Sequence, residues 1–137
     1  MYNRSGSQNN SSLGRSGEYL TCFYLEQLHC KPTITRSDGY DIIAEYQNKI
    51  IRIECKSSSQ SSARRSDFQF STARGGNRRL ITKKDCDVVA LVCIPFMHVE
   101  FLHISLIKKT RIRRKRSHFF RQGIEEKTWL KAISRIE

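Results

Sequence analysis

Two β-rich runs separated by a short polar break constrain the fold of this chain more than any other feature. The runs cover residues 40–46 and 49–56, and Gln47-Asn48 lies between them. Both runs are rich in β-branched and aromatic residues, and such a pair around a two-residue polar break is typical of a β-hairpin. If Gln47 and Asn48 form the turn, Tyr46 lies opposite Lys49. Each further pair is then one residue earlier on the first strand and one residue later on the second.

This register brings two acidic side chains together. Asp41 falls opposite Glu54, where Cβ atoms lie about 4.5–5.5 Å apart and like charges destabilise the pair. Side chains alternate along a strand, so Lys56 shares this face, whereas the other face is apolar and predicts the core. A bound divalent cation would neutralise the acids, since Mg²⁺ binds one or two carboxylates together with waters and phosphate oxygens. Two alternatives stay open: an ion pair with Lys56 on a solvated face, and a register slip that turns Glu54 to the other face.

Net charge indicates the class of partner. The 137 residues, the length of one domain, include 25 Lys and Arg against 13 Asp and Glu, which gives +12. This excess favours a polyanionic partner, most often nucleic acid. The sequence has neither a membrane-length apolar stretch nor a hydrophobic signal core. Its five cysteines are odd in number and widely spaced, which argues against a disulfide framework. We therefore expect a protein that is not secreted, in the cytoplasm and associated with the nucleoid.

The N-terminal part predicts a tail followed by a helix. Residues 1–16 are rich in Ser, Asn and Gly and carry two arginines without an acid, so we expect a disordered basic tail. Residues 17–137 then form a single domain. Ser16 as N-cap and Glu18 in the first turn predict a helix that ends near Cys30, because Pro32 prevents its continuation. Glu18 has an alternative role, which is simply to complement the helix dipole.

The remaining elements follow from apolar patterns. Residues 87–94 predict a buried strand, residues 99–104 its antiparallel partner, and residues 122–136 contain a final helix. Residues 33–36 and 67–72 predict two shorter strands. Residues 57–66 and 74–79 predict loops, the second of them basic and glycine-containing. Residues 108–137 form a basic C-terminal extension.

Basic residues gather in the loops after the hairpin and in this extension. The candidates for nucleic-acid contact are Arg64, Arg65, Arg74, Arg78, Arg79, Arg111, Arg113, Arg114, Lys115 and Arg116. Phosphate contacts would supply affinity that falls with salt, and an arginine in the major groove would read guanine. For the run within residues 108–121, a solvated face or a targeting signal is the alternative.

Histidines and cysteines predict no metal centre. Cys86, Cys93, His98 and His103 match no compact zinc spacing, and strand alternation separates the two cysteines. We therefore do not expect zinc. His118 has no catalytic partner nearby in the sequence, so we expect a structural or solvent-facing role for it.

The order of these acids resembles a nuclease signature. Asp41, twelve intervening residues and then Glu54-Cys55-Lys56 resemble the PD-(D/E)XK nuclease motif, although Tyr40 stands where that family often has proline. The helix opening at residues 14–18 also resembles small members of this superfamily. The similarity covers residues 14–107 and is greatest to intron-encoded homing endonucleases of this class and to archaeal Holliday-junction resolvases. It implies an α/β fold with a restriction-endonuclease-like core, in which helices flank a mixed central β-sheet.

The resemblance also implies roles for particular residues. Asp41 and Glu54 would hold Mg²⁺, with Mn²⁺ as a substitute, and the backbone carbonyl of Cys55 would be a further ligand. Lys56 would position the attacking water or help to deprotonate it, and would steady the charge on the phosphate. Glu18 would supply an additional carboxylate near the metal.

The implied activity is that of a Mg²⁺-dependent endodeoxyribonuclease that hydrolyses phosphodiester bonds in double-stranded or branched DNA. A sequence-specific homing-type enzyme ranks above a junction resolvase, because the loops are longer and more arginine-rich than a shape reader needs. Cutting two strands implies a homodimer or homotetramer. The rival hypothesis is a non-catalytic basic module that binds nucleic acid, in which Asp41, Glu54 and Lys56 are structural.

Overall fold

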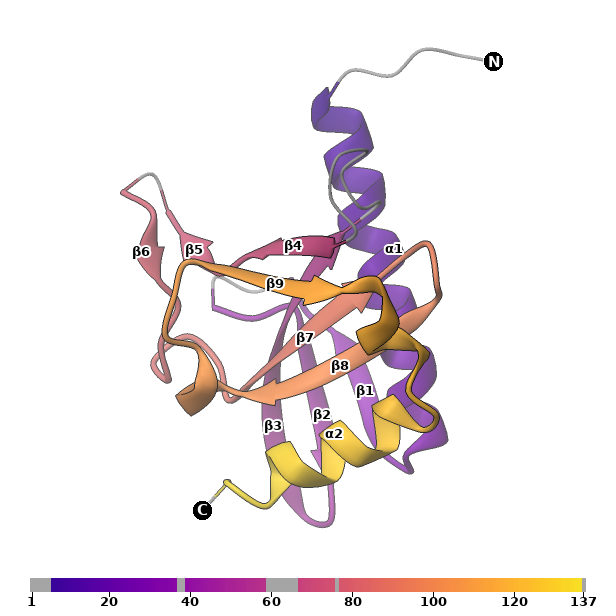
Figure 1. Cartoon of the computed structure of the whole chain (residues 1–137). Helices are drawn as coiled ribbons and strands as arrows, with labels where there is room; N and C mark the ends of the chain where they lie inside the picture. The colour runs from indigo at the N-terminus through magenta and orange to yellow at the C-terminus, as the bar shows by residue number, and fades with distance from the viewer. Residues whose placement is uncertain (1–5, 37–38, 59–66, 76, 137) are drawn as a thin grey trace.

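The predicted hairpin is present and lies within a larger sheet. The computed structural model describes residues 6–36, 39–58, 67–75 and 77–136 (Figure 1). Strand β2 (Ile42–Tyr46) pairs antiparallel with β3 (Lys49–Ser58), and Tyr46 lies opposite Lys49 as predicted. Gln47 and Asn48 have φ values of 48° and 65°, which are the positive angles that a two-residue hairpin turn of this type requires. The turn therefore forms without glycine.

A mixed five-stranded sheet organises the described residues. Its order is β1-β2-β3-β7-β8, where β1 is Lys31–Ile34, β7 is Val88–Cys93 and β8 is His98–His103. Strands β3 and β7 are parallel, and the other neighbours are antiparallel. Every residue of β7 is buried, as its continuous apolar run predicted. The helices α1 (Gly6–Gln27) and α2 (Ile124–Ile133) flank this sheet, so the predicted α/β fold is confirmed (Figure 1).

Helix α1 begins earlier than we predicted. Residues 6–16, expected to be disordered, are helical, while residues 1–5 lie outside the described residues. Ser16 and Glu18 consequently lie within the helix and not at its N-terminus. The physical reason is that no proline interrupts residues 6–27, and extending an existing helix costs much less than nucleating one. The helix ends at Gln27, and His29 then adopts a left-handed conformation with a φ of 66°.

Two apolar cores lie on the two faces of the sheet. The first joins both helices to alternate strand positions such as Ile42, Ile53 and Val92, with Trp129 of α2 fully buried. The second lies under a small sheet formed by β4 (Asp67–Ser71) and β9 (Arg111–Lys115), which run antiparallel. The 3₁₀-helices η1 (Ile104–Leu106) and η2 (Arg116–Phe120) border this layer. The residues predicted as a basic loop at 74–79 instead carry a short hairpin of β5 (Ala73–Arg74) and β6 (Arg79–Leu80).

Helix α2 protects the exposed edge of strand β8. The backbone N–H of Val99 donates to Glu125 Oε2 at 2.9 Å, and that of Phe101 donates to Thr128 Oγ1, also at 2.9 Å. Side chains thus take the place of a neighbouring strand, which is one way that proteins block edge-to-edge pairing. No helix among the described residues is long and apolar enough to span a membrane.

Candidate active site

The structure brings the two predicted hairpin acids together. Asp41 directly precedes β2, and its N–H donates to the carbonyl of Ile53 at 2.9 Å, which extends the ladder by one step. Its Oδ2 accepts a hydrogen bond of 2.9 Å from the N–H of Cys55. The Asp41 carboxyl also forms a side-chain hydrogen bond with Glu54. The two acids are therefore in contact, as the register predicted.

Cys55 presents its backbone and its thiol to different sides. The thiol lies 3.6 Å from Thr21 Oγ1 on α1, and burial raises the pKa of the Cys55 thiol well above its usual range. A thiol that stays protonated is a poor metal ligand. The N–H and C=O of one strand residue point to the same edge, so the carbonyl of Cys55 lies on the edge that faces Asp41. Only the predicted carbonyl, and not the sulfur, is placed for a ligand role.

Glu18 reaches this region from α1. A Cβ atom at Gly17 would lie only 1.9 Å from Ser57 Oγ, so the absence of a side chain there lets the helix approach β3 closely. The Glu18 side chain is buried, and its Oε1 lies 3.0 Å from Arg36 Nε. Burial and the negative charge of Asp41 raise the pKa of Glu18, while Arg36 opposes them. Glu18 is thus electrostatically coupled to Asp41. The prediction that Glu18 lies in the first turn of its helix was wrong, because the helix begins at Gly6.

Glu54 is buried, which disfavours its ionised form. Burial, the hydrogen bond with Asp41 and the charge of Asp41 raise the pKa of Glu54 to about 8. The positive charges of Lys56 and Arg74 lower it but do not offset the burial. Lys56 is half-buried on the same face of β3, which is the position that the alternation predicted. Glu54 therefore holds its proton more tightly than a free glutamate does, and a further positive charge beside it would favour its ionised form.

Arg74 and Asp85 belong to the site although the sequence did not indicate it. Arg74 Nη1 forms an ion pair with Glu54 Oε2, and Arg74 Nε lies 3.8 Å from Asp85 Oδ1. Asp85 is buried, and its hydrogen bonds with Arg79 hold the pKa of that carboxyl well below its usual range. We predicted Arg74 only as a DNA contact and did not consider Asp85. Nothing local in the sequence indicates that Arg74 contacts Glu54 and Asp85, because the three residues lie far apart along the chain.

The other predicted basic residues fall into distinct groups. Arg64 and Arg65 lie outside the described residues. Arg79 forms a forked ion pair with Asp85 at 2.8 and 3.0 Å, and Arg114 forms one with the buried Glu100 at 2.9 and 3.3 Å. The exposed members are Arg78 beside the β5–β6 turn, Arg111, Arg113 and Lys115 along β9, and Arg116 at the start of η2.

His118 has a partner that sequence reasoning missed. Its Nε2 lies 3.0 Å from Glu100 Oε1, which also binds Arg114. Burial lowers the pKa of His118, with Glu100 opposing this shift. This cluster connects η2 to β8 and lies on different elements from the hairpin acids, which agrees with a structural role.

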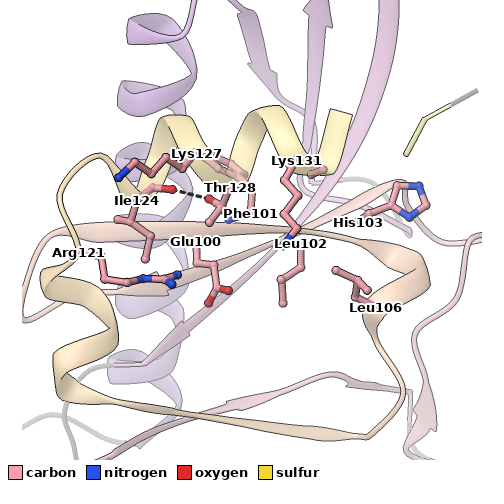
Figure 2. Close-up of a pocket in the computed structure, with 11 residues that line it drawn as sticks. Glu100, Phe101, Leu102, His103, Leu106, Arg121, Ile124, Lys127, Thr128 and Lys131 are labelled. Carbon is pink, nitrogen blue, oxygen red and sulfur yellow. Dashed lines mark hydrogen bonds between the residues drawn. The ribbon is translucent and has the colours of Figure 1, made fainter. Parts of the chain in front are cut away.

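A pocket of about 280 Å³ lies elsewhere, between β8 and α2. Figure 2 shows its wall, where Thr128 donates a hydrogen bond to the carbonyl of Ile124. Basic side chains such as Lys127 and Lys131 contribute to the lining, together with Glu100 and Leu102. None of Glu18, Asp41, Glu54 or Lys56 lines it, so this pocket is separate from the candidate active site.

The donor atoms near Asp41 fit a hard cation and not zinc. Asp41 and Glu54 supply carboxylate oxygens, and the edge of Cys55 supplies a carbonyl oxygen. Mg²⁺ uses one or two carboxylates and fills its remaining positions with waters and phosphate oxygens. Among the described residues, no group of three or more His, Cys, Asp or Glu side chains could by itself hold a metal ion. This open arrangement suits a cation that also binds substrate.

Comparison with known proteins identifies the architecture. No protein-family model matches the sequence. No curated protein matches it either. Among solved structures, the bacterial homing endonuclease I-Ssp6803I is similar with a TM-score of 0.62 and 14% identity, over 89% of this chain and 95% of that chain. The chain shares its mixed α/β fold with this structure. At this identity the likeness concerns the fold alone, and it confirms at that level the resemblance to homing endonucleases that the sequence indicated.

Helix α1, the β2–β3 hairpin and the β5–β6 hairpin each bring charged side chains to one region. Strand β3 pairs with β2 through residues 49–53 and with β7 through residues 53–58, so both halves of the strand that carries Glu54 and Lys56 are held in the sheet.

Proposed function

We propose that this chain is a divalent-metal-dependent DNA endonuclease of the PD-(D/E)XK class, and that it acts as a sequence-specific homing-type enzyme. One observation carries the proposal. Asp41 and Glu54 are in direct contact at the open end of a hairpin, with Lys56 on the same face and Glu18 coupled to Asp41. This constellation lies in a fold shared with a bacterial homing endonuclease.

A divalent cation would be held by Asp41, Glu54 and the carbonyl of Cys55. When bound, Mg²⁺ would lower the pKa of a ligand water and neutralise charge on the phosphate. The pKa of Glu54 supports this assignment, because a buried acid next to the charge of Asp41 ionises more readily when a divalent cation lies beside both. Mn²⁺ has similar preferences for oxygen ligands and is expected to substitute.

The chain's own residues supply orientation and charge. Lys56 lies beside Glu54 and is placed to orient the attacking water and to stabilise the developing negative charge on the phosphate. Glu18 adds a carboxylate that holds water or a second cation next to Asp41. The exposed cations of β9 bind the DNA backbone and supply affinity that falls with salt.

The substrate is double-stranded DNA, and each copy of the domain has one such site. Cutting both strands therefore requires at least two copies, and we propose a symmetric homodimer or homotetramer. Mass measured by light scattering in the presence and absence of DNA distinguishes these assemblies from a monomer.

Cleavage assays test the proposal. Supercoiled plasmid, a random-sequence duplex library and a four-way junction are incubated with the protein in Mg²⁺, Mn²⁺ or chelator, and cut ends are sequenced. We expect metal-dependent cutting at a defined duplex sequence, lost in Asp41→Asn and Glu54→Gln. The matched control is Glu126→Gln, which changes an exposed acid on α2.

Other results would reject parts of the proposal. Preferential cutting of the junction would identify a resolvase. Binding of DNA without cutting of any substrate, together with no heat of Mn²⁺ binding, would identify a non-catalytic module.

A further inference from the structure

Arg74 occupies an unusual position for a basic residue in a DNA-binding protein. Its guanidinium is directed inward onto Glu54, and both side chains are largely buried, at 23% and 7% exposed. Arg74 Nη1 also donates to the carbonyl of Gly39 at 3.4 Å, two residues before Asp41. The Arg74 guanidinium therefore contacts both β3, which carries Glu54, and the segment that leads into Asp41.

A second carboxylate, that of Asp85, also lies near Arg74. Asp85 Oδ1 lies 3.8 Å from Arg74 Nε, and the same carboxylate accepts a hydrogen bond of 2.8 Å from the N–H of Thr82. A Cβ atom at Gly39 would lie 2.8 Å from the backbone oxygen of Asp85, so the two loops are in close contact. Arg74 is thus shared between a fixed carboxylate, Asp85, and the acid Glu54.

A guanidinium on Glu54 Oε2 weakens that carboxylate as a metal ligand, because both cations draw on the same negative charge and repel each other. A guanidinium on Glu54 Oε2 supplies one positive charge, whereas a divalent cation supplies two and binds oxygen at shorter range. A cation that binds Asp41 and Glu54 therefore competes with Arg74. Because Asp85 remains beside Arg74 Nε, release from Glu54 does not leave the guanidinium without a partner.

We propose that Arg74 is an internal counter-cation of the candidate metal site. It pairs with Glu54 Oε2 in the free protein, is released when a divalent cation binds, and then contacts the phosphate to be cut. A guanidinium is suited to this exchange, since its planar fork binds carboxylates and phosphates in the same bidentate manner. The inference rests on the proposed function.

Calorimetric titration of the full chain with Mn²⁺ alone, without DNA, tests the exchange. Arg74→Gln removes the competing cation, so we expect it to bind Mn²⁺ about tenfold more tightly than wild type, or about 1.4 kcal/mol. The matched control is Arg79→Gln, which removes the same charge from the same β5–β6 hairpin and also contacts Asp85. We expect the control to keep the wild-type affinity within about twofold, if competition at Glu54 and not the general field is responsible.

A second readout concerns the phosphate. At saturating Mn²⁺, we expect single-turnover cleavage by Arg74→Gln to be slower by about 100-fold, because a charged phosphate contact is lost. Unchanged Mn²⁺ affinity in Arg74→Gln, or an equal gain in Arg79→Gln, would overturn the exchange.

The exchange can also be followed in wild-type protein, with a variant used only to assign the signal. The Nε–Hε NMR signal of Arg74, assigned by its loss in Arg74→Lys, should shift on titration with Mg²⁺ and not with K⁺ at equal ionic strength. A signal that Mg²⁺ leaves unmoved, in a protein that cleaves DNA, would refute this inference alone. Absence of both Mn²⁺ binding and cleavage in wild type would refute the proposed function as well.

Discussion

The Oδ2 atom of Asp41 accepts a hydrogen bond of 2.9 Å from the backbone N–H of Cys55. The N–H of Asp41 itself donates to the carbonyl of Ile53 at 2.9 Å. These two bonds hold the acid against the edge of β3 where that strand extends beyond β2. The hairpin backbone therefore positions the carboxylate beside Glu54, independently of any ligand.

Two substitutions at Asp41 should separate its structural role from its catalytic one. Asp41→Asn keeps an oxygen that accepts the bond from Cys55, whereas Asp41→Ala leaves that N–H without its acceptor. We expect Asp41→Ala to be less stable than Asp41→Asn by about 1–2 kcal/mol, the usual cost of an unpaired polar group. Urea unfolding measures this difference, and equal stabilities would contradict it. Both variants should cleave DNA at least about 100-fold more slowly than wild type.

The raised pKa of Glu54 predicts how stability depends on pH. The folded protein binds a proton at Glu54 more tightly than the unfolded chain does, so stability is lost as pH rises from about 4.5 to about 8. Glu54→Gln cannot ionise and should lack this loss. In chelator, we therefore expect the melting temperature of Glu54→Gln to exceed that of wild type increasingly between pH 5 and pH 8, by several degrees at the upper end. Parallel curves in scanning fluorimetry would show that Glu54 is not the group responsible.

The same group predicts a pH dependence for metal binding. A cation binds the ionised carboxylate, and below pH 8 it must displace the proton held by Glu54. We expect the apparent Kd for Mn²⁺ to rise by up to about tenfold per unit of pH between pH 7.5 and pH 6. Calorimetry in buffers of different ionisation enthalpy should also detect release of close to one proton. Affinity that is constant over this range would contradict an ionisable ligand at Glu54.

Replacing either of two glycines of α1 with alanine should change the stability of the protein, in opposite directions. A Cβ at Gly17 would lie 1.9 Å from Ser57 Oγ and 3.2 Å from Ser57 Cβ, whereas one at Gly14 would meet nothing within 4 Å. We expect Gly17→Ala to destabilise the protein by about 1–3 kcal/mol through overpacking, and Gly14→Ala to stabilise it by about 0.5–1 kcal/mol through helix propensity. Chemical unfolding measures both. Replacing Ser57 with Gly should restore part of the stability of Gly17→Ala, and failure to do so would place the strain elsewhere.

Substitutions at two adjacent arginines of β9 should have different effects, one on stability and the other on DNA binding. Arg114 faces inward and binds the buried Glu100, whereas Arg113 is exposed. We expect Arg114→Met to cost about 3–5 kcal/mol, because it leaves an acid buried without its arginine. Arg113→Met should leave stability within about 0.5 kcal/mol and reduce the salt dependence of DNA binding by about one unit of slope. Thermal melts and fluorescence anisotropy at several salt concentrations test the pair, and similar stability losses would contradict it.

Local sequence determined the parts of this protein that rest on alternation and turn formation. The register of the β2–β3 hairpin placed Asp41 next to Glu54, and Lys56 on the same face, because side chains alternate strictly along paired strands. The apolar run of β7 predicted a strand buried on both faces. These features depend on neighbouring residues, so they could be read without knowing what packs around them.

Only the tertiary structure decided which charges meet. In the sequence, nothing distinguished Arg74 from the other arginines that follow the hairpin. In the structure, Arg74 forms an ion pair with Glu54 and lies near Asp85. Helix α1 likewise extends further toward the N-terminus than its polar sequence predicted. An ion pair between β3 and β5 depends on how these segments pack, since charge attraction depends on distance in space and carries no sequence periodicity. The hairpin therefore predicted where the acids lie, and the folded chain determined which cations neutralise them.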